Sequence, residues 1–156
     1  MRRKILQTVG IFLLCLGILT GCGRRDEKEM VGRALGMDLS EGRVVRFWDD
    51  HGGFHGDGTV FCEMLLEDLV PGKEWKQLPY PTEIEEFLSA TENFFSEGDG
   101  SVLPEVTEGF YYFENRAYGA DDPFDPTGVN GQASYNVTLA IYDAGAEVLY
   151  YLEVDT

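Results

Sequence analysis

The side chains best suited to chemistry lie together in one short segment of the chain. His51 and His55 are the only histidines in the sequence, and Asp49 and Asp57 flank them on either side. Zinc and related divalent metals are commonly bound by imidazole and carboxylate together, and three protein ligands plus a water make the open site of a metalloenzyme. The segment therefore predicts a divalent metal site, for binding or for metal-dependent hydrolysis, formed by Asp49, His51, His55 and Asp57.

The same segment also has a purely structural interpretation. Four of the eight residues from 51 to 58 are glycine, a density typical of a tight hairpin loop. Asp and His side chains in such loops commonly bond to the backbone and hold the turns. The i, i+4 spacing of His51 and His55 would suit a zinc pair on a helix, but so many glycines disfavour a helix. We favour the structural interpretation, keep metal binding as the alternative, and otherwise expect no cofactor.

Other arrangements that support catalysis are weak or missing in the sequence. Cys62 has no clear base beside it, and no Gly-x-Ser-x-Gly motif occurs. The glycines from 52 to 58 lead into a strand-like run rather than a helix, which argues against a phosphate-binding loop. No pair of carboxylates stands out as the acid and base of a glycosidase. We therefore expect a non-enzymatic binding protein rather than an enzyme.

A second candidate surface is aromatic. The chain has 8 tyrosines and 10 phenylalanines, and several tyrosines fall in its last third. A sheet face that exposed Tyr111, Tyr118, Tyr142 and Tyr151 would suit the binding of a protein, peptide or glycan partner. In the alternative interpretation these tyrosines cover a half-buried sheet, and only their hydroxyl groups reach water.

The first 22 residues carry a targeting pattern. Three basic residues, Arg2 to Lys4, precede the mostly apolar run Ile5 to Leu19, which ends in Leu19-Thr20-Gly21-Cys22. The run is shorter than the roughly 20 residues that span a bilayer, so it is typical of a secretory signal. The segment resembles the lipobox signal of bacterial lipoproteins. That resemblance implies a diacylglyceryl group on Cys22 and cleavage before it.

The resemblance also sets the expected organisation of the chain. Residues 1–21 would be a lipoprotein signal peptide, 22–28 the lipidated cysteine with a short polar tether, and 29–156 a single domain. The protein would then lie on the extracytoplasmic side of the cell membrane, and its contact with the membrane would come through the lipid on Cys22.

The charge of the chain excludes one class of partner. The net charge is −16, and removal of the three bases of residues 1–21 would take it to −19. After residue 82, Arg116 is the only base against 16 acidic residues. Such a surface repels phosphate backbones, so we expect no nucleic-acid partner.

The cysteine count leaves a single thiol in the mature chain. Cys15 lies in the predicted signal and Cys22 would take the lipid, so only Cys62 remains and no internal disulfide can form. Val60 and Met64 share its face of a strand-like run. This pattern predicts a small buried hydrophobic residue rather than a reactive thiol.

Hydrophobic periodicity outlines the elements. A short helix is expected over 29–35. Alternation of period two predicts strands over 43–50 and 59–67, paired around the glycine-rich loop, and a second hairpin from strands over 133–142 and 147–154.

The main helix is expected to begin near Pro81, because Thr82 and Glu85 have the spacing of a capping box. Ile84 and Phe87 recur at helical spacing and mark its buried face.

One more strand, over 109–115, completes the pattern of a helix, a hairpin, a helix and three strands. This order predicts an α+β domain: a small antiparallel sheet of about five strands, with one main helix and one short N-terminal helix packed on one face.

The 17 residues from 116 to 132 form a connection long enough to be functional or mobile.

Overall fold

The computed structural model describes residues 26–52, 56–94, 103–117, 119 and 121–156. The predicted signal peptide, Cys22 and the predicted site residues His55 and Tyr118 lie outside these ranges. Within the described ranges, no helix is both long and apolar enough to cross a bilayer.

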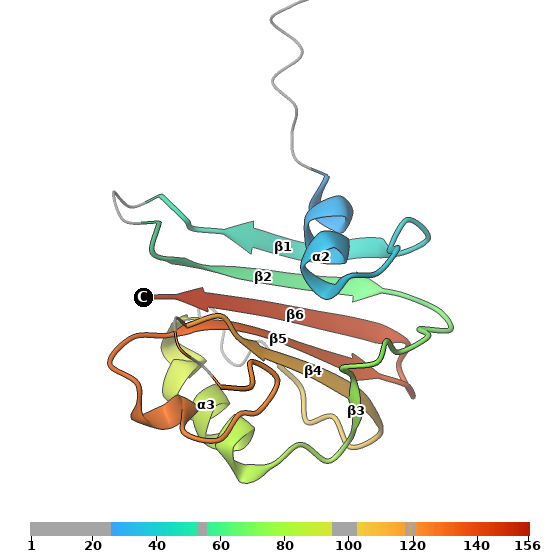
Figure 1. Ribbon diagram of the computed structural model, residues 1–156. Coiled ribbons are helices and arrows are strands. Elements are labelled where there is room, and N and C mark those ends of the chain that lie inside the picture. Colours follow the sequence, from blue (N-terminus) through green and yellow to red (C-terminus); the bar gives the residue numbers. More distant parts are fainter. Residues whose placement is uncertain (1–25, 53–55, 95–102, 118, 120) are drawn as a thin grey trace, which may run out of the picture.

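In the part of the chain that the structure describes, one antiparallel sheet of six strands forms the centre and two α-helices accompany it, which confirms the predicted α+β class (Figure 1). The strands follow the order β1-β2-β6-β5-β4-β3 across the sheet. Their bounds are β1 Arg43–Asp49, β2 Gly58–Leu65, β3 Lys76–Gln77, β4 Gly109–Asn115, β5 Asn136–Asp143 and β6 Val148–Asp155. The α-helices are α2 Glu27–Leu35 and α3 Thr82–Thr91, and the 3-10 turns are η1 Glu92–Phe94 and η2 Val129–Gly131. The sequence did not predict β3, because two residues are too few to show a period.

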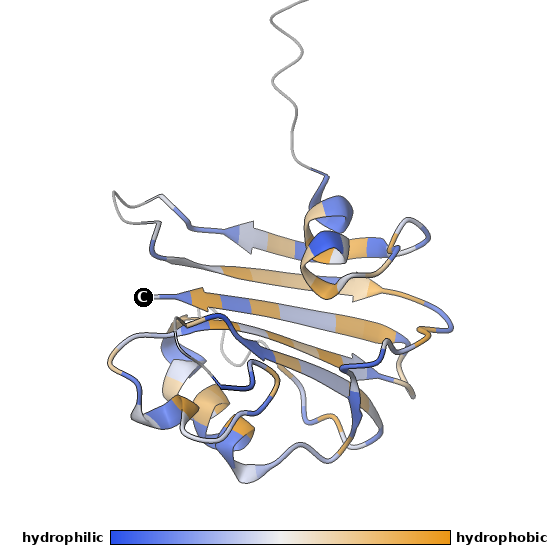
Figure 2. Cartoon of the chain, in the orientation of Figure 1, coloured by the Kyte–Doolittle hydropathy of each residue, from blue (hydrophilic) through white to orange (hydrophobic). Residues whose placement is uncertain are grey.

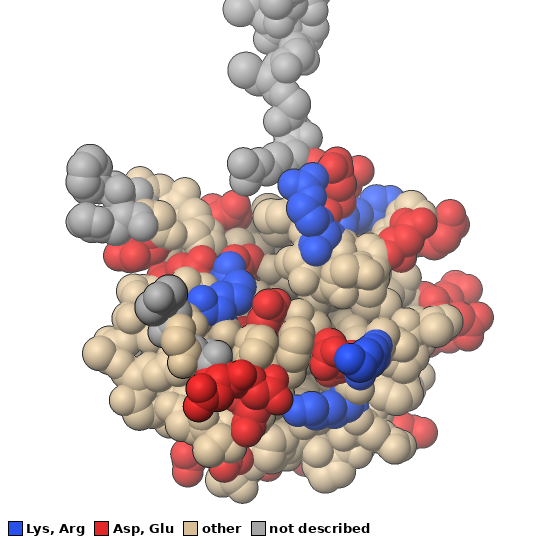
Figure 3. Space-filling view, in the orientation of Figure 1, with Lys and Arg blue, Asp and Glu red and all other residues tan. Residues whose placement is uncertain are grey.

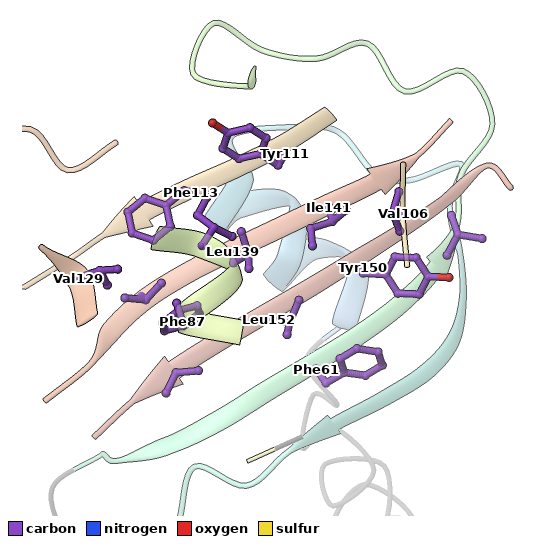
Figure 4. Packing of buried hydrophobic residues seen from close by; sticks show 14 residues of the cluster. Phe61, Phe87, Val106, Tyr111, Phe113, Val129, Leu139, Ile141, Tyr150 and Leu152 are labelled. Carbon is purple, nitrogen blue, oxygen red and sulfur yellow. The ribbon is translucent and has the colours of Figure 1, made fainter. Parts of the chain in front are cut away.

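The two helices cover opposite faces of the sheet, which corrects the expectation that both pack on one face. On one face, Ile84 and Phe87 of α3 are fully buried in a cluster with Phe61, Leu139 and Leu152 (Figure 4).

On the other face, Val31 and Leu35 of α2 pack in a second cluster with Cys62, Met64 and Tyr151. Strands β5 and β6 are buried on both faces over most of their length, and Figure 2 shows hydrophobic residues concentrated in the central strands. A strand that is apolar on both faces needs a cover on each side, and the two helices supply it.

Both predicted hairpins are confirmed by the register of the sheet. In the first, Phe61 of β2 lies opposite Trp48 of β1, and the two rings stack with centroids 4.4 Å apart. In the second, Leu139 of β5 lies opposite Leu152 of β6. Strand β6 also pairs with β2, so the last strand of the fold joins the two hairpins into one sheet.

Helix α2 begins at Glu27, two residues before the predicted start. The carboxylate of Asp26 caps it by accepting a hydrogen bond from the Lys28 backbone N–H, and Gly36 ends it in the left-handed conformation at φ 65°. Residues 27 and 28, assigned to the tether from the sequence, therefore belong to the first turn of this helix.

Helix α3 begins where the sequence predicted it, but it ends at Thr91 rather than near Gly98, and the predicted capping box is not formed. Pro81 is the N-cap residue and makes no side-chain capping hydrogen bond, and Thr82 is the first helical residue. The buried face of Ile84 and Phe87, rather than a cap, accounts for the position of this helix.

The long connection from 116 to 135 is attached to both faces of the sheet. Phe124 packs edge-on against Tyr112 at 5.9 Å between ring centroids. Val129 of η2 is fully buried on the α3 face, and the Asn130 side chain donates a hydrogen bond to the Glu83 carbonyl of α3.

Candidate functional site

A network of charged side chains occupies one end of the sheet. The β1–β2 loop and the end of β6 lie at this same end (Figure 1), because β2 and β6 are antiparallel neighbours with Gly58 opposite Asp155. We call the five side chains Asp49, His51, Arg116, Glu153 and Asp155 the polar network. They come from three parts of the chain: the end of β1 with its loop, the residue after β4, and the end of β6.

His51 lies between two carboxylates. Its Nδ1 is 2.9 Å from Oδ1 of Asp49, and the same oxygen accepts the backbone N–H of His51 at 3.0 Å. Its Nε2 is 3.3 Å from Oδ2 of Asp155. Both ring nitrogens therefore face an acidic oxygen.

Arg116 holds the two acidic residues of β6 that share a face. One guanidinium nitrogen lies 2.7 Å from Oε1 of Glu153, and another lies 2.7 Å from Oδ1 of Asp155. The Arg116 side chain is 31% exposed, and the two carboxylates are 17% and 22% exposed. These pairs are therefore partly shielded from water, which makes them stronger than fully exposed ones.

Short-range contacts hold the residues at the two ends of the β1–β2 connection, where His51 lies. The carboxylate of Asp50 accepts hydrogen bonds from both the backbone N–H and the hydroxyl of Thr59. Gly58 lies so close to His51 that a Cβ there would come within 2.7 Å of the His51 Cα. Only glycine allows this approach, so the backbone of His51 rests directly on the start of β2.

The electrostatics of the network favour a positive charge between His51 and Asp155. Partial burial by itself lowers the pKa of His51, but its hydrogen bonds to Asp49 and Asp155 outweigh that effect and raise the pKa above its usual value. Burial, together with the charge of Glu153, raises the pKa of Asp155 despite the nearby Arg116. Both shifts favour a proton on the pair.

The structure brings together two of the four predicted metal ligands. Asp49 and His51 are in contact, Asp57 is exposed, and His55 lies outside the described residues. Among the described residues, no group of three His, Cys, Asp or Glu side chains is gathered closely enough to enclose a metal ion.

Sequence reasoning missed Asp155, Glu153 and Arg116 as members of this site. Asp155 is 104 positions from His51, and only the pairing of β6 with β2 makes them neighbours. Arg116 was visible as the only base after residue 82, but nothing in the sequence pointed to its partners.

The predicted tyrosine surface is corrected at three of its four positions. Tyr111, Tyr142 and Tyr151 are only 5%, 4% and 1% exposed, so they belong to the core, and Tyr118 lies outside the described residues. The reason is that both faces of the sheet are covered, so neither face leaves its rings in water. Within the described ranges, the exposed large hydrophobic side chains stand on three separate segments: Val45, Val70 and Phe94.

Two of the buried tyrosines bond to glutamates along the same strand. The Tyr112 hydroxyl donates to Glu114 at 2.7 Å, and the Tyr151 hydroxyl donates to Glu153 at 2.6 Å. Burial is the main cause that raises the pKa of both phenols, and the adjacent carboxylates add to it. Tyr151 thereby connects the α2-side core to Glu153 of the polar network.

Cys62 is buried, as the sequence predicted. It is 1% exposed, and burial raises the pKa of its thiol to about 12. A thiol with that pKa is not ionised at neutral pH, so it acts as a core side chain.

A second acidic group lines a hollow beside the connection from 116 to 135. Asp122 and Asp125 contribute to it, together with Asp121. The first two accept the backbone N–H groups of Phe124 and Thr127, so they hold the turns of this connection. We assign this group a structural role.

Comparison with known proteins gives no match: no family model, curated protein or solved structure is similar to this chain. The candidate site is therefore interpreted from its own chemistry.

Proposed function

We propose that this protein is a membrane-anchored extracytoplasmic lipoprotein whose α+β domain is a non-enzymatic binding module. The observation that carries the proposal is the Leu19-Thr20-Gly21-Cys22 motif, followed closely by a folded domain. Asp26 already caps the first helix, four residues after Cys22. Four extended residues span at most about 14 Å, so a lipid on Cys22 would hold the domain close to the bilayer.

The distribution of charge supports this orientation. Between residues 22 and 46, six bases stand against five acids, whereas from residue 47 onward three bases stand against 23 acids. In Figure 3, some of the basic side chains lie over α2. Anionic headgroups would repel the acidic remainder, so the domain would point away from the membrane with its α2 end nearest to it.

The polar network supports binding rather than catalysis. Its members are already engaged with one another: both ring nitrogens of His51 face carboxylates, and Arg116 is shared by Glu153 and Asp155. A general base needs a free nitrogen within reach of its substrate, whereas a binding surface gains from charged groups that are fixed in advance. We assign recognition of a protein, peptide or glycan partner to this end of the sheet.

Lipid attachment is tested by growing producing cells with labelled palmitate. We expect the wild-type protein to take up label and to fractionate with membranes, and Cys22→Ser to lose the label. Cys15→Ser is the matched control, because Cys15 lies inside the apolar run and should not receive lipid. Label retained by Cys22→Ser would overturn the proposal.

Partner binding is tested with a photo-cross-linking amino acid placed at Asp57, which is exposed and directly precedes Gly58, the residue opposite Asp155. The matched control carries it at Ala144, which is exposed in the β5–β6 turn at the other end of the sheet. We expect a discrete cross-linked species from position 57 and none from position 144. Equal cross-linking at both positions, or none at either, would contradict a binding role for the network.

A further inference from the structure

We propose that His51 is a proton-dependent link between the ends of β1 and β6, which is closed when the imidazole is charged and broken when it is neutral. The link makes this end of the sheet sensitive to pH. It is independent of the lipid anchor and of partner binding, because it depends only on the contacts of one side chain.

The contacts of His51 require a proton on each ring nitrogen. Nδ1 lies 2.9 Å from Oδ1 of Asp49, and Nε2 lies 3.3 Å from Oδ2 of Asp155. An ionised carboxylate only accepts hydrogen bonds, so each nitrogen must donate one. A neutral imidazole has one N–H, whereas an imidazolium has two. The geometry of the site is therefore that of the charged ring.

The two contacts differ in what they join. Asp49 is two residues from His51, and its Oδ1 also accepts the backbone N–H of His51 at 3.0 Å, so this contact is local. The longer contact, with Asp155, joins positions 104 residues apart and connects the two strand ends. A neutral ring should keep its single proton on Nδ1, where the acceptor is closer, and Nε2 then presents a lone pair to Asp155. Two facing lone pairs repel, so the contact that breaks is the one between the strands.

A group that does not titrate holds the carboxylate of Asp155 in place. The guanidinium of Arg116 lies 2.7 Å from Oδ1 of Asp155, and it stays charged at any pH that the folded protein meets. The other oxygen, Oδ2, therefore remains directed at His51 in both states of the ring. When His51 loses its charge, the ring has to turn away from Asp155, and the strand ends lose a contact.

The surroundings of the ring favour its charged form. The charged groups that the structure places around it are Asp49 and Asp50 on its own segment, Arg116 after β4, and Glu153 and Asp155 at the end of β6. Four carboxylates thus stand against one guanidinium. Partial burial alone would lower the pKa of His51, but the hydrogen bonds to Asp49 and Asp155 raise it above its usual value.

The direction of the pH effect follows from this shift. The pKa of His51 is higher in the folded protein than in the unfolded chain, where it is about 6.5. The link therefore contributes its full stability below about pH 6.5, and that contribution is lost as the pH rises through the raised pKa. Asp155 acts with the same sign, because burial raises its pKa as well, and its contribution is lost as the pH rises from about 3.9 through the raised value.

A nitrogen NMR titration of the full-length protein in detergent tests the state of the ring, and His55→Asn assigns the two histidine signals. We expect the wild-type His51 ring to titrate above about pH 6.5 and to keep its proton on Nδ1 when neutral. Asp155→Asn should lower the midpoint, because the ring loses one of its two carboxylates. Asp57→Asn is the matched control: it removes the same charge from an exposed position outside the polar network, so it should move the midpoint less. Circular dichroism shows whether each variant is folded.

Amide hydrogen exchange measures whether the strand ends loosen. Two backbone N–H groups report on this end of the sheet: that of Asp50 donates to the Thr59 carbonyl at 3.1 Å, and that of Thr156 donates to the Tyr135 carbonyl at 2.9 Å. We expect the protection of both to fall about 3- to 10-fold between roughly one pH unit below the midpoint and one above it. This is the effect of losing one partly exposed charge-assisted hydrogen bond.

The other end of the sheet supplies the internal control. The Leu66 N–H donates to the Glu147 carbonyl at 2.9 Å there, and the changes in protection are measured relative to it. His51→Gln cannot gain the charge, so its relative protection should stay constant over the same pH interval.

Several results would overturn the proposal. A wild-type His51 ring that titrates at or below about pH 6.5 would show that the carboxylates do not favour its charge. A neutral ring with its proton on Nε2 would keep the contact with Asp155 in both states. Relative protection that is the same at both pH values in the wild type, or that falls equally in His51→Gln, would show that His51 does not control the strand ends.

Discussion

The guanidinium of Arg116 stabilises the acidic end of β6. Glu153 and Asp155 lie on the same face of the strand, two residues apart, and the guanidinium is 2.7 Å from each carboxylate. Without it, two partly buried acids would lie next to each other on one face of the strand with no base to offset them. Arg116, the only base after residue 82, therefore offsets the negative charge of these two carboxylates.

We predict that Arg116→Gln destabilises the protein by about 1–2 kcal/mol, because it removes two shielded charge-assisted hydrogen bonds. Urea unfolding measures the change. Arg33→Gln is the control, since Arg33 pairs with Glu29 on the surface, where both side chains are at least 70% exposed. The control should change stability by less than about 0.5 kcal/mol. Equal effects of the two substitutions would show that the network does not stabilise the fold.

The buried thiol of Cys62 leads to a prediction about its chemical modification. A pKa raised to about 12 keeps the thiol protonated in the folded protein, whereas an unfolded cysteine ionises near 8.5. Iodoacetamide at about pH 8.5 should therefore leave Cys62 unmodified in the native state and alkylate it in denaturant. Mass spectrometry of the digested protein measures the modification, and fast alkylation of the folded protein would contradict the buried position.

At the scale of single residues, the sequence identified candidate site residues but not the side chains that contact them. Asp49 and His51 could be selected because they are two positions apart and chemically suited to a site. Asp155 could not, because its closeness to His51 depends on β6 lying beside β2, and strand order is not contained in local periodicity. The predicted tyrosine surface was wrong for a related reason. Alternation shows which residues share a face of a strand, but not whether another element covers that face.

At the scale of elements, the two hairpins account for most of the sheet. Their predicted strands and shared faces are confirmed, since local alternation and turn residues specify both. The local sequence does not specify on which face of the sheet each helix packs. The pattern of a short amphipathic helix shows that one side of the helix is buried, but not which sheet face it covers. The main helix was predicted from Ile84 and Phe87, and the structure buries both.

The β5–β6 hairpin carries a prediction about the core. Ile141 is 2% exposed and lies opposite Tyr150, so Ile141→Ala should leave a cavity and cost about 2–5 kcal/mol. Thermal and urea unfolding measure this loss. Val70→Ala is the control, because Val70 is 79% exposed and its truncation should change stability by no more than about 0.5 kcal/mol. Similar effects of the two would mean that the register of the hairpin is wrong.

The β1–β2 hairpin carries a prediction about its glycines. A Cβ on Gly58 would meet the backbone of His51 at 2.7 Å, whereas a Cβ on Gly52 would meet nothing closer than 3.7 Å. Gly58→Ala should therefore displace His51 from Asp155 and cost about 1–3 kcal/mol, and Gly52→Ala should be tolerated. Nitrogen chemical shifts of the His51 ring would report the displacement. Unchanged shifts in Gly58→Ala would refute the close packing.

At the scale of the whole molecule, the charge is distributed unevenly. Six of the nine bases that follow residue 21 lie before residue 47, in the tether, α2 and β1. The polar network lies at the end of the sheet where the β1–β2 loop and the end of β6 meet. In the proposed orientation, the lipid and the α2 region would face the membrane, and most of the acidic surface would face outward.

The central claim of this account is the anchor on Cys22, and intact mass spectrometry of the protein extracted from membranes of producing cells tests it most directly. We predict a chain that begins at Cys22 and carries a diacylglyceryl group on its sulfur, with residues 1–21 removed. A chain that still begins at Met1, that is cut at another position, or that has an unmodified Cys22 would contradict it.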